Sequence, residues 1–289
     1  MGFRHDHRFL RSDGTPDFSS RKRISESELE PVMRRDVVTV HKTTPVKECA
    51  KKMSTSGFRR LPVVAEERKL EGIVTATDLV NYLGGGEYYA IVEMRHKGVI
   101  YSALREPVSS IMTRGVISAD YHERLSSVIE KMLRFDIGGL PVTSRGEVVG
   151  MVTEHDVLKA ISDRIPDIKV SDVMTRDVVC AEIDESLMDV AKKIVSHGVR
   201  RLPVLSRGKV VGVVSTMDIV RYIASAEPYR RVILGLVEEA MEARVADVAS
   251  PYVVSVHPSA GLREAYRLMM EREVGMLVVI SGKRLLGVI

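Results

Sequence analysis

The stretch Gly57-Phe-Arg-Arg-Leu-Pro-Val63 returns twice with small changes, as Ile137-Gly-Gly-Leu-Pro-Val142 and as Gly198-Val-Arg-Arg-Leu-Pro-Val204. In all three copies a methionine stands 29 residues before the proline, and a fourth, weaker copy has Ala249 and Val278 at the same interval. A fixed period of this kind is typical of repeat architectures. The sequence therefore predicts four tandem copies of one small unit.

A second motif follows each proline and combines a glycine, a hydroxyl and an acid. It reads Gly72-Ile-Val-Thr-Ala-Thr-Asp78, Gly150-Met-Val-Thr-Glu-His-Asp156 and Gly212-Val-Val-Ser-Thr-Met-Asp218. The fourth copy reaches Gly287-Val-Ile289, so its hydroxyl and acid would follow residue 289. A hydroxyl followed three residues later by an acid is a helix-start signature.

Within one unit the pattern reads strand, helix, strand, strand, helix. Residues 37–40 alternate like a strand, while Val46, Cys49, Ala50 and Met53 fall on one face of a helix. Two apolar runs, 61–64 and 70–74, flank a charged turn, and a helix is expected over 75–83. The predicted fold class is α/β (α+β), built from four β-α-β-β-α units.

The units alternate in type. Units one and three carry the arginine pair, whereas units two and four have an acid at the preceding glycine position (Asp136, Glu273) and a glycine at the first arginine position (Gly138, Gly275). A unit of this size buries little core alone, so we expect the units to pair into two modules. The expected organisation is a flexible tail (1–30), units at 31–84, 108–165, 166–226 and 245–289, and linker helices at 85–107 and 227–244.

Bulk composition limits the class of protein. The chain has 289 residues, 45% hydrophobic and 28% charged, with a net charge of +4 and two cysteines. These values predict a globular cytoplasmic protein without a membrane segment. No block of like charges indicates nucleic-acid binding. His5 and His7 lie in the expected tail, and we predict no metal site there.

The quoted motifs resemble the CBS domain, named after cystathionine β-synthase. Four copies with Arg-Arg before Leu-Pro are similar to the gamma subunit of AMP-activated protein kinase and to archaeal stand-alone proteins related to it. The resemblance covers about residues 31–289. It implies that pairs of units form modules and that two modules form a disc-like pseudo-dimer. Adenine nucleotides would bind in the clefts between units.

The resemblance also implies roles for residues, which we carry over to the matching positions. The ribose candidates are Asp78, Asp156 and Asp218. The phosphate candidates are Thr75, Thr153, Ser215, Arg59, Arg60, Arg200 and Arg201. Adenine is expected against the first strand and the proline strand, near Val38, Val40, Pro62, Pro141 and Pro203. Because unit two lacks arginines, a nucleotide there would need basic groups from another unit.

Alternative interpretations remain at this point. The Thr/Ser-x-x-Asp motifs could serve only as helix caps, and alternation along a strand would turn the two arginines of a pair to opposite faces. His155 is expected to face solvent. The preferred function is a regulatory sensor of AMP, ADP or ATP that signals to a kinase or other effector. The alternatives are a module for S-adenosylmethionine or an interaction scaffold. No catalytic set and no catalytic cofactor is predicted, and the chain could be monomeric or a homodimer.

Overall fold

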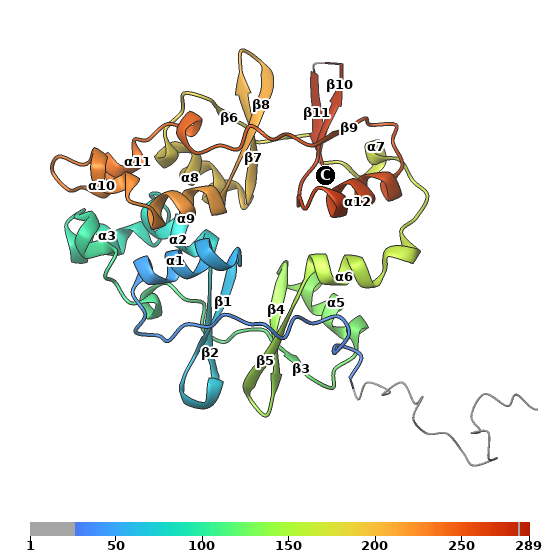
Figure 1. The fold of residues 1–289 in the computed structure, drawn as a ribbon, viewed down its shortest axis with the longest axis horizontal. Coiled ribbons are helices and arrows are strands. Elements are labelled where there is room, and N and C mark those ends of the chain that lie inside the picture. The colour runs from blue at the N-terminus through green and yellow to red at the C-terminus, as the bar shows by residue number, and fades with distance from the viewer. Residues whose placement is uncertain (1–26, 283) are drawn as a thin grey trace, which may run out of the picture.

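The computed structural model describes residues 27–282 and 284–289. Viewed down its shortest axis the molecule has a rounded outline, with units 1 and 2 in one half and units 3 and 4 in the other (Figure 1). The expected tail to residue 26, including His5 and His7, lies outside the described residues.

The elements recur in the predicted order. Unit 1 contains α1 (Val46–Ser56), β1 (Arg60–Val64), η1 (Glu66–Arg68), β2 (Leu70–Thr75) and α2 (Ala76–Leu83). Unit 2 contains η2 (Val108–Ser110), β3 (Ala119–Asp120), α5 (Leu125–Arg134), β4 (Gly139–Ser144), β5 (Glu147–Thr153), α6 (Glu154–Ala160) and η3 (Ser162–Arg164). Unit 3 contains α7 (Val170–Val173), β6 (Ala181–Glu182), α8 (Leu187–His197), β7 (Arg201–Ser206), β8 (Lys209–Ser215) and α9 (Thr216–Ala224). Unit 4 contains η4 (Val245–Asp247), β9 (Ser255–Val256), α12 (Leu262–Glu271), β10 (Val278–Ser281) and β11 (Arg284–Val288).

Each unit builds one small sheet whose middle strand follows the first helix. In units 2, 3 and 4 a two-residue first strand pairs in parallel with the middle strand, which pairs in antiparallel fashion with the last strand. In unit 1 the expected strand over 37–40 is reduced to one bridge, between Val40 and Val63. The predicted fold class is confirmed in this arrangement.

The first helix of unit 1 forms for the reason that the sequence pattern gave. Val46, Cys49, Ala50 and Met53 are all fully buried on one face. The helix ends at Gly57, whose φ of 73° lies in the left-handed region that glycine adopts without strain. Local periodicity and a glycine stop are sufficient to define this element.

Units pair through backbone hydrogen bonds: the segment before the first strand of each unit pairs with the last strand of the neighbouring unit. Arg34 and Met151 exchange two backbone hydrogen bonds of 2.9 Å. The corresponding pairs are Thr113 with Ile73, Thr175 with Val288, and Ser250 with Val213. Units 1 and 2 therefore form one module, and units 3 and 4 form the other.

The repeated methionine and glycine meet in this exchange. A Cβ on Gly72 would lie 2.7 Å from the sulfur of Met112, and one on Gly150 would lie 2.7 Å from the sulfur of Met33. A side chain larger than hydrogen at these glycines would collide with the neighbouring unit. The constant spacing of the methionine within each unit therefore reflects its contact with the glycine of the neighbouring unit.

The two modules dock through units 1 and 3. Their buried side chains form one continuous apolar cluster that includes Leu79 on α2 and Ile194 on α8. At Gly84, which directly follows α2, an added Cβ would lie 2.2 Å from the Cβ of Ala191 on α8. This glycine is thus a site of close approach between the two modules.

Three expectations about boundaries change. Each linker holds two short helices in place of one, α3 (Tyr89–His96) with α4 (Ile100–Ala103), and α10 (Glu227–Arg231) with α11 (Val237–Met241). A glycine with positive φ, Gly98 or Gly235, separates the helices of each linker. The tail was expected to extend to residue 30, but Leu29 is fully buried in the core of unit 2. Among the described residues, no helix has the length and apolar character needed to span a bilayer.

Candidate functional site

The three hydroxyl–acid motifs all begin helices. The backbone N–H of Thr75 donates to Asp78 Oδ2 at 2.7 Å, and its hydroxyl donates to the same oxygen at 2.8 Å. Thr153 and Ser215 bind Asp156 and Asp218 in the same way, with hydroxyl distances of 2.5 and 2.6 Å. Each motif therefore caps its helix, and each cap uses one oxygen of its carboxylate.

The other carboxylate oxygen distinguishes the three acids. Asp156 Oδ1 accepts from Arg34 Nε at 3.1 Å, and Asp218 Oδ1 accepts from Arg221 Nη1 at 2.9 Å. For Asp78 the described residues supply no hydrogen bond to Oδ1. Burial raises the pKa of Asp78, and the hydrogen bonds from Thr75 oppose that rise.

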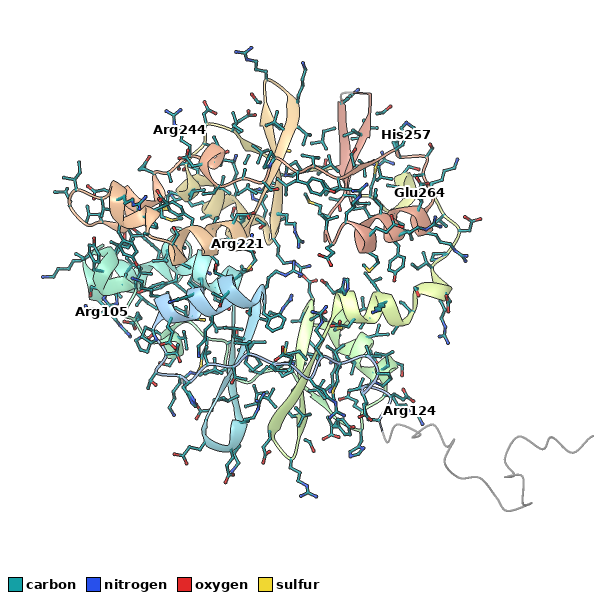
Figure 2. The ribbon with its side chains drawn as sticks, viewed as in Figure 1. Arg105, Arg124, Arg221, Arg244, His257 and Glu264 are labelled. Carbon is teal, nitrogen blue, oxygen red and sulfur yellow. The ribbon has the colours of Figure 1, made fainter. Side chains whose placement is uncertain are left out.

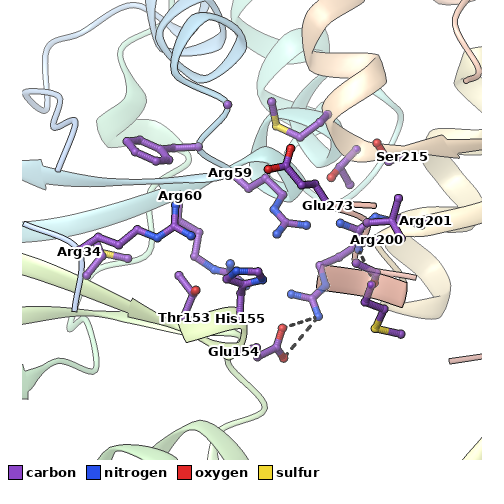
Figure 3. A pocket seen from close by; sticks show the side chains of 18 of the residues that line it. Arg34, Arg59, Arg60, Thr153, Glu154, His155, Arg200, Arg201, Ser215 and Glu273 are labelled. Carbon is purple, nitrogen blue, oxygen red and sulfur yellow. Dashed lines mark hydrogen bonds and ion pairs between the residues drawn. The ribbon is translucent and has the colours of Figure 1, made fainter. Parts of the chain in front are cut away.

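A cavity of about 610 Å³ occupies the centre of the molecule, where all four units meet. Figure 3 shows side chains from both modules converging on it, and Figure 2 shows Arg221 near the centre while Arg105, Arg124 and Arg244 lie at the periphery. Of the predicted site residues, the cavity is lined by Val38, Arg59, Arg60, Thr153, Arg200, Arg201 and Ser215. The structure thus brings seven of the predicted residues into one space.

Both arginines of each pair line the cavity, so the expectation that alternation would separate them is wrong. The strands begin only at Arg60 and Arg201, and the preceding Arg59 and Arg200 lie in bends. Strand alternation does not apply across that boundary, because the first arginine of each pair has no strand geometry.

The glycines of units 2 and 4 make room for arginines of units 1 and 3. A Cβ on Gly138 would lie 2.6 Å from both Arg60 Nη2 and Arg200 Nη1. A Cβ on Gly275 would lie 2.8 Å from Arg201 Nη2, whose Nη1 also donates to the Gly275 carbonyl at 3.2 Å. The alternation of arginine and glycine in the sequence is therefore a fit between neighbours in space.

The arginine cluster is electrostatically strained. Burial, reinforced by Arg200 and Arg59, lowers the pKa of Arg60 to about 10. Burial, reinforced by Arg59 and Arg200, also lowers the pKa of Arg201 to about 10. Arg200 has one acidic partner, Glu154, at 3.1 Å. Like charges that are partly removed from water favour an incoming anion, because it supplies the missing countercharge.

The prolines sit in the middle strand of each sheet and interrupt its pairing with the first strand. In unit 1 the pairing starts where Val40 N–H donates to the Pro62 carbonyl at 3.0 Å. The preceding hydrogen bond, from residue 62 to the Val38 carbonyl, cannot form because proline has no N–H. Val38 is half-buried and lines the cavity, so its backbone carbonyl is available to a ligand.

The remaining predicted residues lie elsewhere. Val40 is buried in the core, and the side chains of Pro62, Pro141 and Pro203 are buried within their sheets. Four more predicted residues are outside the lining of the central cavity: Thr75, Asp78, Asp156 and Asp218.

Sequence reasoning missed most of the other lining residues, among them Arg34, His155 and Arg221. Arg34 and Arg221 both reach an acid of the repeat motif, and His155, which was expected to face solvent, is exposed into the cavity. For His155, the sequence did offer a signal: it stands next to Asp156 at a predicted helix start, where a ligand was expected. Arg34 and Arg221 carry none, because neither belongs to the repeated pattern.

A second cavity of about 370 Å³ lies beside the linker helices. Tyr101 and Tyr229 stack there with ring centroids 5.4 Å apart, and the Lys47 ammonium lies 4.5 Å from the Tyr229 ring. None of the predicted site residues lines it. Over the part of the chain that the structure describes, no group of three or more His, Cys, Asp or Glu residues could hold a metal.

Comparisons with known proteins agree with this architecture. The family model of the CBS domain matches residues 27–85, 108–163, 170–225 and 245–289. Protein MJ1225 of Methanocaldococcus jannaschii is 32% identical over 259 residues, which is 88% of this chain and 92% of that protein. A 33.4 kDa protein encoded in a ribosomal RNA operon of Thermofilum pendens is 28% identical and covers 82% of this chain and 79% of its own length.

The crystal structure of MJ1225 aligns with a TM-score of 0.83 and 31% identity, over 89% of this chain and 95% of that one. MJ1225 is described there as a proposed archaeal homologue of γ-AMPK.

Proposed function

Because this chain belongs to the CBS-domain family, we propose that it is a regulatory, non-catalytic protein that binds AMP, ADP or ATP between its units. The observation that carries the proposal is the convergence of four arginines from two units on one central cavity, beside two helix starts. A single chain supplies both modules, so the proposed unit of function is the monomeric pseudo-dimer. Its relative MJ1225 is described in terms of the gamma subunit of AMP-activated protein kinase, which supports a sensing role.

Charge favours a phosphate ligand. Six arginines line the cavity (Arg34, Arg59, Arg60, Arg200, Arg201 and Arg221), whereas three acids do so (Asp36, Glu154 and Glu273). Arginine binds phosphate in a bidentate manner, and helix N-termini add backbone N–H donors. S-adenosylmethionine carries a positive sulfonium and no phosphate, so this lining disfavours it.

The proposed binding mode combines two neighbouring units in each cleft. In the best-defined cleft, Asp156 would hold the ribose, while Thr153, Arg59 and Arg60 would bind the phosphates. Adenine would lie against Val38 and donate to its unpaired carbonyl. Units 1 and 2 thus supply different parts of one site. Unit 2 has glycine in place of the first arginine, so the phosphate-binding arginines must come from unit 1.

The equivalent cleft on the other face of unit 1 would use Asp78 and Thr75 against unit 2 and Pro141. Its phosphate cations would be Arg60 and Arg200, which meet over Gly138. Asp218 and Ser215 are the third candidate pair. Pro203, Arg200 and Arg201 of unit 3 would face unit 4.

Signalling would follow from phosphates that bind arginines of both modules. Such a ligand favours the arrangement of the modules that brings those arginines together, and differential affinity for two arrangements is what a signal requires. A kinase or another effector would read the change.

Isothermal titration of nucleotide-free protein with AMP, ADP, ATP and S-adenosylmethionine tests the proposal. We expect the adenine nucleotides to bind and S-adenosylmethionine to bind at least 10-fold more weakly. Asp156→Ala should remove a ribose partner and lower the number of nucleotides bound, while Asp163→Ala, an exposed acid outside the cavity, should bind like the parent.

Two results would contradict the proposal. If S-adenosylmethionine binds more tightly than every nucleotide, the protein is a module for that ligand. If no adenosine compound binds, the Thr/Ser-x-x-Asp motifs act only as helix caps, and the protein is an interaction scaffold on a CBS fold.

A further inference from the structure

The first hydrogen bond between the first and middle strands differs among the four units. In units 1, 2 and 3 the middle strand carries Pro62, Pro141 or Pro203 at this position, so the bond to the residue 24 positions earlier cannot form. Those earlier residues are Val38, Ile117 and Val179. All three are half-buried, and the described residues supply no hydrogen bond to their carbonyls. A half-buried backbone carbonyl needs a partner, and the exocyclic amine of adenine is a suitable donor.

Unit 4 has Val278 at the same position, and there the bond forms. Val278 N–H donates to the Val254 carbonyl at 3.0 Å. Parallel pairing in unit 4 accordingly starts at residue 278 itself, with Ser255 opposite Val278. In unit 2 it starts one residue after the proline, with Ala119 opposite Val142. In unit 4 the N–H of Val278 therefore makes the hydrogen bond between the first and middle strands that proline prevents in the other three units.

The hydrogen bond between Val278 and Val254 lies in the cleft next to Asp218. Ser250 of unit 4 pairs with Val213 of unit 3, which places the first strand of unit 4 beside the helix start at Ser215, as Arg34 places that of unit 1 beside Thr153.

Two further contacts occupy the Asp218 cleft. Arg221, three residues along the same helix, binds Asp218 Oδ1 as Arg34 binds Asp156 Oδ1, so this contact is common to both clefts and does not distinguish them. Arg201 donates to the carbonyl of Gly275, at the position where units 1 and 3 carry their first arginine. What distinguishes this cleft is that two backbone carbonyls of unit 4 are already paired, that of Gly275 with Arg201 and that of Val254 with Val278.

We infer that the cleft between Asp218 and unit 4 does not accept an adenine nucleotide and that Val278 is the residue that closes it. The inference rests on the proposed function and assigns nucleotide binding to Asp78 and Asp156 but not to Asp218. The three repeat motifs, which are equivalent in sequence, are then unequal in function. The difference arises on the neighbouring unit, 60 residues away along the chain.

The test is isothermal titration with AMP of the nucleotide-free parent, Asp78→Ala, Asp156→Ala and Asp218→Ala. We expect the first two substitutions each to lower the number of AMP molecules bound by about one and Asp218→Ala to leave it unchanged. Val278→Pro removes the N–H and should add one molecule, which Val278→Pro combined with Asp218→Ala should lose again. Val278→Thr keeps the N–H and a β-branched side chain, so it should bind like the parent.

Hydrogen exchange provides a second readout. The amide of Val278 should remain protected, with an unchanged exchange rate, when AMP is added at saturation. If Val278→Pro fails to fold, the comparison of Asp156→Ala with Asp218→Ala in the intact chain still decides the question. Loss of one bound AMP in Asp218→Ala would overturn this inference alone. Absence of binding of AMP, ADP and ATP by the parent would overturn the proposed function and this inference together.

Discussion

Units 1 and 3 pack against each other through a shared core, whereas units 2 and 4 have separate cores. Units 1 and 3 share one apolar cluster that runs through α1, α2, α8 and α9. The buried side chains of units 2 and 4 form two separate clusters. Figure 1 shows α6 and α12 facing each other across the centre, and the central cavity lies between them, lined by Leu158 and Met269.

This difference separates a rigid part from a part that a ligand can move. Units 2 and 4 are joined to their partners by the exchanged backbone pairs, and to the opposite module by polar contacts such as Arg200 with Glu154. Packed cores resist deformation, while an exposed ion pair is weak. Ligands that bind the arginines would therefore shift units 2 and 4 against a fixed pair of units 1 and 3.

The largest effect is expected where units 1 and 3 pack most closely. Gly84→Ala adds a methyl group 2.2 Å from the Cβ of Ala191 and 2.6 Å from the carbonyl of Val80. Gly84 has a φ of −105°, so only the contact, not the backbone, opposes the methyl. Overpacking of this kind costs about 1–3 kcal/mol. Thermal unfolding followed by circular dichroism should show a midpoint lower by roughly 2–4 °C for each kcal/mol.

Gly261→Ala is the matched control for this substitution. No atom lies within 4 Å of the added methyl group, and Gly261 has ordinary negative φ. The control should change the midpoint only slightly. Adding Ala191→Gly to Gly84→Ala should recover part of the loss, because the contact with Val80 remains. Equal midpoints for Gly84→Ala and Gly261→Ala would show that α2 and α8 do not dock this closely.

The arginine cluster should give the next largest effect, with opposite signs for stability and binding. Arg60→Gln removes a half-buried positive charge that lies close to Arg200 over Gly138, so the ligand-free protein should unfold at a higher temperature. The same change should weaken ATP binding about 10- to 100-fold, since a charged hydrogen bond contributes about 1.5–3 kcal/mol. Arg207→Gln, at an exposed hairpin tip, is the control. A lower midpoint together with unchanged binding would refute the strained-cluster interpretation.

The pH dependence of the cluster follows from the lowered pKa values. Arg60 and Arg201 have a pKa of about 10 in the folded protein, below the value of 12.5 that an unperturbed arginine has. Between these values the unfolded chain binds more protons, so the contribution of both residues to stability rises with pH. Nucleotide affinity should instead fall as pH passes about 10, because neutral arginine holds phosphate poorly. Nucleotide affinity should be measured by titration of the parent and of Arg60→Gln at pH 8, 9 and 10, from roughly two pH units below the folded pKa up to that pKa. The affinity of the parent should fall more steeply with pH than that of Arg60→Gln. An equal fall in both proteins would contradict this prediction.

Sequence reasoning predicted the elements that depend on neighbours along the chain. The helix with Cys49 on its buried face and the helix start at Thr75 both formed as expected, because periodicity and capping are local. The spacing of 29 residues also predicted the repeat.

What the sequence could not provide are the contacts between units. In the sequence, Gly138 stands where units 1 and 3 have an arginine. In the structure, its lack of a side chain leaves the space that Arg60 and Arg200 occupy. Arg34 binds Asp156 across 122 positions of the chain. Leu29 is an isolated apolar residue in a charged segment, and only the core of unit 2 explains it. Such features depend on the placement of whole units, which no local pattern records.

The smallest effect is expected at the ion pair between Arg200 of unit 3 and Glu154 of unit 2, which links the two modules. Arg200 Nη2 lies 3.1 Å from Glu154 Oε2, and both side chains are substantially exposed, at 40% and 52%. Exposed pairs contribute about 0–1 kcal/mol, so Glu154→Gln should leave the unfolding midpoint nearly unchanged. It should release Arg200 for phosphate and strengthen ATP binding about 2- to 5-fold, and AMP binding less, because in the proposed binding mode the longer phosphate chain of ATP would reach further towards Arg200. Glu147→Gln, on the exposed start of β5, should alter neither ligand. Weaker binding in Glu154→Gln would mean that Glu154 holds Arg200 in its productive position, and that units 2 and 3 are coupled before the ligand arrives.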